Sequence, residues 1–369
     1  MKKTSFHDVN LRYGAQMKEM FGYYLPWEYS NGHEQEHIGT RMTASLCDLG
    51  YMGIFTIEGS DSLPYMQRLF TIDCESLTNG QIRYTTMCNS EGSMMDDGTL
   101  WKIGTNNYMF ISGDEGDLEW LCKNTFGFDV IVKNINIEHT TAALQGPYSK
   151  KILSKLTDAD LDGIKYYHFI ESKVAGIECT IARMGYTGEF GFEIHCNPQY
   201  AERIWDSIME AGKEYGIVPC AQAALESLRQ EAGYLLVGNE HNKSINPFKA
   251  GIGFVVNLKK ESFNGKDALV EILKKGIDEQ LVWFNLSGGE VPETGDGVFF
   301  QDKKIGVVTS GSYSYTSKAG TTMAYVNKKY AIAYAPYQIE IDGKRCDARL
   351  SIIPLYDPTD IKSKGQGVV

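Results

Sequence analysis

The sequence predicts an α+β protein of two or three domains, and three observations carry this prediction. The chain has 369 residues, more than the roughly 250 to 300 at which a single hydrophobic core stops growing. Strand and helix patterns alternate between residues 51 and 139, as in a small α+β domain. Beyond Lys259 the segments resemble short strands separated by turns such as Gly288-Gly289 and Asp342-Gly343, so we expect an all-β C-terminal region.

The first third of the chain is expected to begin with an irregular segment. Gly22 and Pro26 interrupt the aromatic stretch 21–29, and a helix is expected to follow, as far as Arg41. Strands are then expected at 54–57, 83–86 and 108–111, with a helix after residues 59–61.

The clearest predicted hairpin lies in the middle of the chain. Apolar and polar residues alternate over 177–181 and again over 192–195, and residues 185–189 form the turn between them. Two helices are expected next. The first begins at an Asn197 cap and turns Ile204, Trp205 and Ile208 inward, and the second runs from about 221 to 236.

Charge and composition exclude several functions. The 36 Lys and Arg residues against 47 Asp and Glu residues give a formal net charge of −11, which repels nucleic acid and anionic lipid. The sequence contains no apolar run of about 18 to 20 residues and no signal peptide, so we expect a soluble, cytoplasmic protein. Eight dispersed cysteines, without zinc or nucleotide motifs, predict mostly buried thiols, no metal and neither nicotinamide nor ATP chemistry.

Asp96-Asp97 is the first candidate for chemistry. The pair ends an apolar strand pattern beside Gly98, and apolar flanks raise the cost of ionising a carboxylate, which suits a proton acceptor or a stabiliser of positive charge. Alternation along a strand points the two side chains to opposite faces, so at most one is expected to act. The alternative is a pair that caps a turn.

The predicted hairpin is the second candidate. Gly185 and Gly188 permit positive φ, so the loop can turn tightly and present Tyr186 to a flat ligand. Glu193 can accept paired N–H bonds from a heterocycle such as a pterin. An ordinary solvated hairpin is the alternative. The aromatic cluster at Tyr166-Tyr167 can contact a ligand ring, but such clusters more often belong to the core. Met52, Trp101 and Phe110 are likewise core residues by default. Glu226 and Arg229, one helical turn apart, are expected to form a surface pair.

Read in order, the motifs of this chain resemble those of the aminomethyltransferase family, which comprises the glycine cleavage T proteins and their folate-dependent demethylase relatives. The resemblance covers nearly the whole chain. It rests on Asp48-Leu49-Gly50-Tyr51-Met52-Gly53, Asp96-Asp97, Leu144-Gln145-Gly146-Pro147, residues 183–189, Arg229-Gln230-Glu231-Ala232, Asn246-Pro247, residues 263–269 and residues 306–311.

The resemblance implies a three-domain cloverleaf around a funnel for tetrahydrofolate. The expected domains are a discontinuous folate-binding domain (1–50 plus 140–250), a small ferredoxin-like α+β domain (51–139) and a C-terminal all-β domain (251–369) of barrel or jelly-roll type. It also implies that Asp97 is catalytic. Contacts to the ring are implied for Met52, Trp101, Phe110, Tyr166, Tyr167, Tyr186 and Glu193.

Departures from the family pattern guide the donor prediction. Leu225 replaces a family arginine, which removes a guanidinium that binds anions, and Tyr51, Asp357 and residues 112–115 also differ. We therefore expect transfer of a methyl group to tetrahydrofolate from a small methylated donor, which is an amine, a sulfonium or an aryl ether. The aromatic residues Tyr23, Tyr24, Trp27 and Tyr29 would line such a donor site or simply pack the first domain.

Two alternatives stay open. In the first, the protein is a T protein that takes an aminomethyl group from a lipoyl carrier protein and forms methylene-tetrahydrofolate and ammonia. In the second, it is a non-catalytic folate-binding factor for iron–sulfur assembly. Relatives of that kind resemble one another in a late cysteine motif, which is missing around Cys346.

Overall fold

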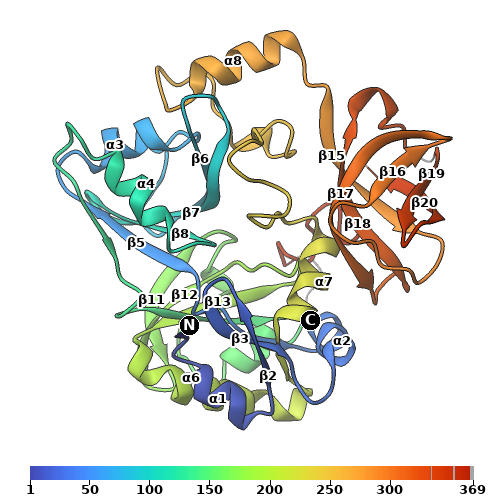
Figure 1. Ribbon diagram of the computed structural model, residues 1–369. Helices are drawn as coiled ribbons and strands as arrows, with labels where there is room; N and C mark the ends of the chain where they lie inside the picture. The colour runs from blue at the N-terminus through green and yellow to red at the C-terminus, as the bar shows by residue number, and fades with distance from the viewer. Residues whose placement is uncertain (334, 352–353, 366–369) are drawn as a thin grey trace.

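Three lobes make up the protein and meet at its centre (Figure 1). This computed structural model describes residues 1–333, 335–351 and 354–365. The N-terminal part and the middle of the chain form the lower lobe, an inserted segment forms the upper left lobe, and the C-terminal part forms a barrel on the right. The three-lobed α+β fold is the one predicted from the sequence.

The lower lobe is built on a six-stranded sheet, with its strands in the order β11-β12-β13-β10-β4-β14. These strands are β4 (Ser45–Asp48), β10 (Thr140–Gln145), β11 (Phe169–Val174), β12 (Ile177–Ala182), β13 (Gly191–Cys196) and β14 (Val218–Cys220). The helices of this lobe are α1 (His7–Arg12), α2 (His33–Met42), α5 (Ser149–Leu153), α6 (Ala201–Gly212) and α7 (Gln222–Ala232). The antiparallel pairing of β12 with β13 confirms the predicted hairpin.

Helices α6 and α7 follow the predicted periodicity. Ile204, Trp205 and Ile208 on α6 are fully buried, and burial of each such side chain contributes about 1.5 to 3 kcal/mol. The Asn197 side chain accepts a hydrogen bond from Gln199 N and caps the 3-10 turn that leads into α6. Helix α7 ends before the predicted Leu236, because Gly233 adopts a left-handed conformation with φ 77°.

The opening aromatic stretch is not irregular. It forms β3 (Tyr23–Glu28), which lies between β1 (Lys2–Lys3) and β2 (Gln16–Met20) in a three-stranded sheet. The strand tolerates Pro26 because β1 pairs only with Tyr23 and Tyr24, and because the β2–β3 register shifts next to the pairing of Pro26.

The upper left lobe contains a five-stranded sheet, in the order β6-β7-β8-β5-β9, with two helices. Its elements are β5 (Gly53–Glu58), α3 (Ser62–Leu69), β6 (Ile82–Cys88), β7 (Met94–Gly104), β8 (Asn107–Ser112), α4 (Asp117–Lys123) and β9 (Ile131–Asn134). Cys88 pairs with Met94 and Met87 with Asp96, so Met95 is an extra residue on β7, immediately before the two aspartates. Such a bulge bends a strand and redirects its side chains.

The right lobe is a closed six-stranded barrel, in the order β15-β18-β17-β16-β19-β20. Its strands are β15 (Glu279–Leu286), β16 (Gly297–Phe300), β17 (Lys303–Ser314), β18 (Ala319–Asn327), β19 (Pro336–Ile341) and β20 (Lys344–Ser351). The predicted C-terminal barrel is therefore present, and closure leaves the sheet without free edges.

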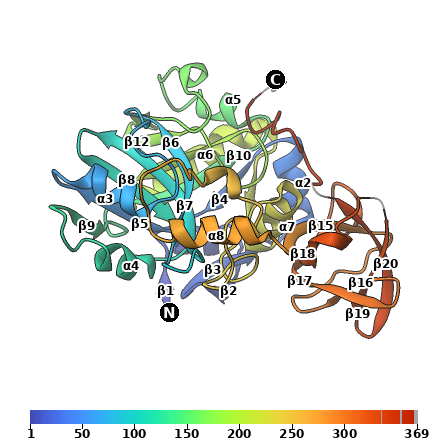
Figure 2. The same cartoon turned by 90° about the horizontal axis from the view of Figure 1, so that it is seen from above.

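The segment that precedes the barrel is not all-β, contrary to expectation. It contains α8 (Lys266–Lys275), whose Leu269 is buried beside Cys88 and Phe263. Figures 1 and 2 place α8 next to the end of β6. Short 3-10 turns complete the secondary structure at Leu161–Gly163, Pro198–Tyr200, Lys213–Tyr215, Gly253–Val255 and Lys328–Tyr330. The arrangement of the sheets does not define the exact limits of the three domains. The limits implied by the resemblance therefore stay a prediction.

Candidate active site

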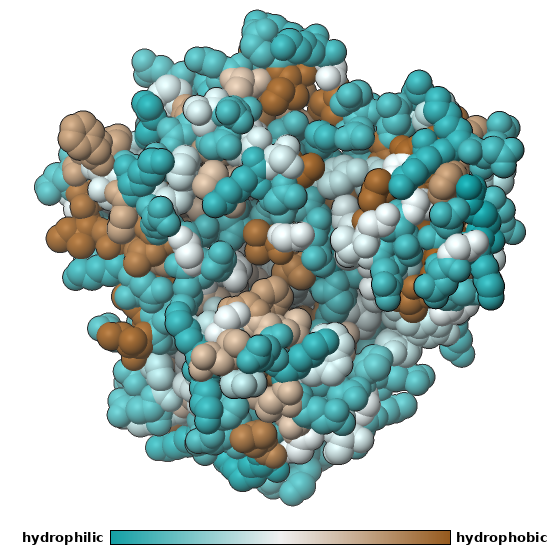
Figure 3. All heavy atoms as spheres, in the orientation of Figure 1, coloured by the Kyte–Doolittle hydropathy of each residue, from teal (hydrophilic) through white to brown (hydrophobic). Residues whose placement is uncertain are grey.

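A central hollow of about 550 Å³ lies where the three lobes meet. Apolar side chains gather in the middle of the molecular face there (Figure 3). Its aromatic lining consists of Phe21, Tyr51, Tyr84, Tyr166, Tyr167, Tyr186, Tyr234, Phe254 and Trp283. The carboxylates in the lining are Asp96, Asp97, Glu193 and Asp360. No Lys, Arg or His contributes to this lining in the described parts of the chain, so the hollow favours a flat ligand and positive charge.

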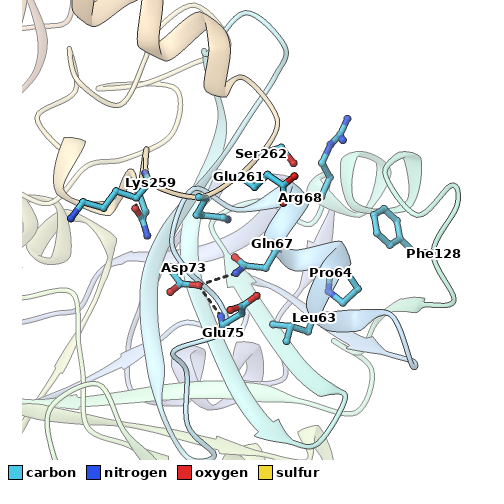
Figure 4. Close-up of a pocket in the computed structure, with 12 residues that line it drawn as sticks. Leu63, Pro64, Gln67, Arg68, Asp73, Glu75, Phe128, Lys259, Glu261 and Ser262 are labelled. Carbon is cyan, nitrogen blue, oxygen red and sulfur yellow. Dashed lines mark hydrogen bonds between the residues drawn. The ribbon is translucent and has the colours of Figure 1, made fainter.

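A second hollow of about 590 Å³ lies beside α3 (Figure 4). Several of its polar groups bind one another or the backbone: Gln67 Nε2 donates to Asp73 Oδ1 at 2.8 Å, and Lys260 Nζ donates to the carbonyls of Phe70 and Ile72, each at 2.7 Å. Burial lowers the pKa of Lys260 to about 8. Because Lys260 fastens its segment to the end of α3, we assign it a structural role and place the chemistry in the central hollow.

Asp97 is held in the wall of the central hollow by two donors. Tyr84 Oη donates to Asp97 Oδ2 at 2.5 Å, and His241 Nε2 lies 2.6 Å from Asp97 Oδ1. The Asp97 side chain keeps 16% of its surface exposed, whereas that of His241 is fully buried. Asp97 is therefore an oriented carboxylate that still reaches the hollow.

Asp96 is buried at the same wall, and the buried carboxyl of Asp117 on α4 is an acidic neighbour of it. Its Oδ1 accepts a hydrogen bond from the backbone N of Asp97 at 2.8 Å. Burial raises the pKa of Asp96 well above its usual range, and the charges of Asp117 and Asp97 raise it further. Burial also raises the pKa of Asp117. The Oδ2 atoms of Asp96 and Asp117 are buried and have no hydrogen-bond partner in the described chain, which favours the uncharged form of these carboxyls.

We expect Asp96→Asn to stabilise the protein as the pH rises. In the wild type, the raised pKa of Asp96 makes the folded state bind a proton that the unfolded state releases above about pH 4, so stability falls as the pH rises towards the folded pKa. Asparagine keeps the shape and does not titrate. The melting temperature of the variant should exceed that of the wild type by about 2 to 4 °C more at pH 8 than at pH 5. A difference that shrinks as the pH rises would contradict the raised pKa of Asp96.

Tyr186 and Glu193 approach the hollow from the β12–β13 hairpin. The Tyr186 ring stacks on Tyr234 with 5.6 Å between ring centroids, and its hydroxyl donates to the carbonyl of Leu235. Glu193 is 3% exposed, and within the described residues its carboxylate accepts no hydrogen bond, although His195 Nε2 lies 3.6 Å away. A buried carboxylate without donors facing a cavity is a ready acceptor for ligand N–H groups.

Of the two hairpin glycines, only one has the expected conformation. Gly188 has φ 77°, whereas Gly185 has an ordinary φ and is needed for space instead. A Cβ at Gly185 would lie 1.8 Å from Gln145 Oε1. The tight turn is therefore packed against a buried glutamine, which excludes the solvated hairpin that we considered as an alternative.

The structure brings Met52, Tyr166 and Tyr167 to the central hollow as well. Tyr166 and Tyr167 meet edge to face, with ring centroids 4.6 Å apart, and Tyr167 has φ 57°. A positive φ is costly for a bulky residue and is often found at functional sites.

Trp101 and Phe110 do not line the hollow. Trp101 has no exposed surface, because Phe169 and His195 cover its ring. Phe110 packs on Phe70, on the opposite face of β8 from Ile111, which does line the hollow. The geometry gives no support to the expected direct contact of these two residues with a ligand ring.

Apart from Phe21, which lines the hollow, the aromatic residues of the opening stretch lie outside it. Tyr29 is buried, Tyr23 Oη donates to Glu115 Oε1 at 2.6 Å, and Lys18 Nζ lies 4.0 Å from the Trp27 ring centroid. Neither these residues nor Tyr24 belong to the lining, so the proposed cation–π wall at this segment is not formed.

The expectation of a surface pair at Glu226 and Arg229 is wrong. Arg229 is fully buried and also binds Glu240, with a distance of 2.6 Å between Arg229 Nη1 and Glu240 Oε2. Burial alone would lower the pKa of Arg229, but the charges of Glu240 and Glu226 outweigh it and raise this pKa. Sequence spacing indicated only the helical neighbour, because Glu240 lies in the irregular segment after α7.

Comparison with known proteins assigns the family. The GCVT N-terminal domain matches residues 6–260, and the glycine cleavage T-protein C-terminal barrel domain matches residues 279–357. The chain belongs to the glycine cleavage T-protein family. Proteins of this family that resemble the chain include the aminomethyltransferases of Caldanaerobacter subterraneus subsp. tengcongensis and Geobacillus sp. (strain WCH70). They are 38% and 37% identical to it, over 90% and 96% of this chain and 89% and 99% of theirs.

The T-protein fold also matches in three dimensions. The crystal structure of glycine cleavage system aminomethyltransferase T from Bartonella henselae superposes with a TM-score of 0.90 at 26% identity, and the match covers 97% of this chain and 98% of that one. As a member of this family the chain is a transferase of the aminomethyltransferase type. None of its described helices combines the length and the hydropathy that crossing a bilayer requires.

Proposed function

We propose that this protein transfers the one-carbon unit of an aminomethyl group, carried on a lipoyl protein, to tetrahydrofolate, with release of ammonia. The central hollow carries the proposal, because it joins an oriented carboxylate, a ring of aromatic side chains and a buried acceptor. The aminomethyltransferase names of the relatives favour this donor over the small methylated donor expected from the sequence.

The residues of the hollow fit a reduced pterin. Glu193 would accept its N–H groups, and Tyr186, Tyr166 and Tyr167 would contact its ring. When bound, tetrahydrofolate supplies the two nitrogens that accept the carbon, and the protons that they lose end on ammonia and on the carrier sulfur. Met52 would fill the apolar side of the same cavity.

Asp97 would stabilise positive charge and accept a proton in the same hollow. Its carboxylate can stabilise the protonated aminomethyl group as it enters an otherwise apolar wall, and it can accept a proton during the transfer. Asp96 is buried and accepts a hydrogen bond from Asp97 N, so it would remain structural.

The small methylated donor remains the second candidate. A free sulfonium or ammonium suits an acidic lining that contains no Lys, Arg or His in the described chain, just as a protonated aminomethyl group does. Leu225, which replaces the expected arginine, is buried in an apolar cluster with Leu49 and Leu228 and does not reach the hollow. The presence of leucine instead of arginine at this position therefore removes a cation without creating a donor pocket.

A direct competition separates the two donors. Purified protein with tetrahydrofolate should turn over aminomethyl-lipoyl carrier protein with a kcat/KM at least about 10²-fold above that of every free methylated amine, sulfonium or aryl ether tested. Methylene-tetrahydrofolate and ammonia should appear in equal amounts. Faster formation of methyl-tetrahydrofolate from a free donor would overturn the proposal and support the second candidate.

The binding-only alternative is disfavoured by the cysteine it would need. Cys346 lies on β20 of the barrel and does not line the hollow. Burial raises the pKa of its thiol, which disfavours the reactive thiolate. Folate binding without turnover of any donor would favour this alternative.

A further inference from the structure

His241 is the buried side chain that contacts Asp97 from outside the strand. The two residues are 144 positions apart in the chain, yet His241 Nε2 and Asp97 Oδ1 are separated by 2.6 Å. The imidazole is fully buried, and Asp96 Oδ1 is 3.8 Å from the same nitrogen. A lone histidine in an irregular segment gives no sequence signal of this contact.

The preceding residue fixes the position of His241. The buried carboxylate of Glu240 accepts hydrogen bonds from Arg229 Nη1 at 2.6 Å, from Leu236 N at 3.0 Å and from the hydroxyls of Thr309 and Ser310. These partners come from α7, from the segment after it and from the barrel. The imidazole is thus held against β7 by a turn that these hydrogen bonds fix in place.

The hydrogen-bond partners assign the tautomer. His241 Nδ1 is buried and has no partner among the described residues. A proton on that nitrogen would be an unpaired buried donor, which costs about 1 to 3 kcal/mol. The proton therefore resides on Nε2 and is donated to Asp97 Oδ1, while Tyr84 donates to Oδ2.

We propose that His241 is the positioning residue for Asp97, and that its Nε2–H fixes the carboxylate in the orientation that transfer requires. This inference rests on the proposed function and adds to it a residue that orients the catalytic carboxylate. Asp96, Asp97 and His241 also offer three ligand atoms within 4.8 Å of one another. The 2.6 Å between Nε2 and Oδ1 fits a hydrogen bond and is shorter than the roughly 3 Å between neighbouring ligands of one metal ion, so we assign a proton to this contact.

Two substitutions separate positioning from packing. His241→Leu fills the space without a donor, and kcat should fall by about 10- to 100-fold while the affinity for tetrahydrofolate stays within about threefold. His241→Gln places an amide N–H near the position of Nε2–H and should recover activity to within about fivefold of the wild type. His33→Leu is the matched control, since His33 forms a half-exposed pair with Glu28 outside the hollow and should leave kcat unchanged.

A spectroscopic measurement tests the contact without turnover. In protein labelled with ¹⁵N-histidine, His241 should show the Nε2–H tautomer at neutral pH, and its Nε2–H signal should move on Asp97→Ala. A Nδ1–H tautomer, or equal loss of kcat in His241→Leu and His241→Gln, would overturn the inference. Loss of activity in a chelator that a divalent cation restores would also overturn it, in favour of a metal site. Failure of the wild type to use any aminomethyl donor would refute the proposed function, while the tautomer measurement would still decide the contact.

Discussion

Asp97→Asn should lower turnover by about 10² or more, with the affinity for tetrahydrofolate changed by less than about threefold. Asparagine preserves the size of the side chain but removes the charge that would stabilise the aminomethyl cation and the lone pairs that would accept a proton. Its amide also presents N–H to one of the two donors, Tyr84 or His241, that now bind the carboxylate. Single-turnover rates and calorimetric folate binding measure the two quantities separately.

Asp96→Asn is the control for this experiment. It makes the same chemical change one residue earlier on β7, where the side chain is 2% exposed and bonded to the backbone N of Asp97. Its effect on turnover should be clearly the smaller of the two. If Asp96→Asn is instead the more damaging change, the assignment of the catalytic carboxylate to Asp97 is wrong.

Glu193→Ala should weaken tetrahydrofolate binding by about 5- to 150-fold, which corresponds to about 1 to 3 kcal/mol. The change would leave the N–H groups of a bound pterin without this acceptor in the wall of the hollow. Isothermal calorimetry gives the dissociation constants, and Glu193→Gln should lie between the wild type and the alanine variant because one acceptor oxygen remains.

Glu178→Ala provides the matched comparison on the same hairpin. Glu178 is exposed on β12, where its carboxylate lies 3.1 Å from Lys173 Nζ, and its loss should not change folate affinity. Wild-type affinity in Glu193→Ala would show that the pterin is held elsewhere, even if the family assignment stands.

Elements with a strong local period could be predicted from the sequence. The β12–β13 hairpin and helices α6 and α7 show alternation or a helical apolar face, which depends only on neighbours in the chain. The same signal was present for α8, where Leu269, Ile272 and Leu273 have helical spacing, but the turn-rich sequence around it favoured strands. Strand β3 was missed because Pro26 is acceptable only where the neighbouring strands leave its backbone N unpaired, which is a property of the sheet.

The candidate site could be predicted only in part, for a similar reason. Asp97 and Tyr186 lie in motifs that resemble those of the family, Glu193 follows on the same hairpin as Tyr186, and all three line the hollow. Tyr84 and His241 lie in no such motif, and they reach Asp97 through strand pairing and through the buried Glu240. Trp101 and Phe110 were expected at the ligand because aromatic identity does not reveal which face of a strand is covered.

The buried Glu240 restricts how the lobes can move relative to one another. It joins Arg229 of the lower lobe to Thr309 and Ser310 of the barrel, and Tyr325 of the barrel donates to its backbone carbonyl at 2.5 Å. A barrel that swung away would leave the Arg229–Glu240 ion pair in place but would break the hydrogen bonds from Thr309 and Ser310 to the carboxylate, each worth about 1.5 to 3 kcal/mol. Hinge motion of the barrel at this contact is therefore disfavoured, and we expect a donor to enter the hollow without displacing the barrel. The width of the opening beside the barrel would then help to select between a slender lipoyl arm and a compact free molecule as the donor that reaches Asp97.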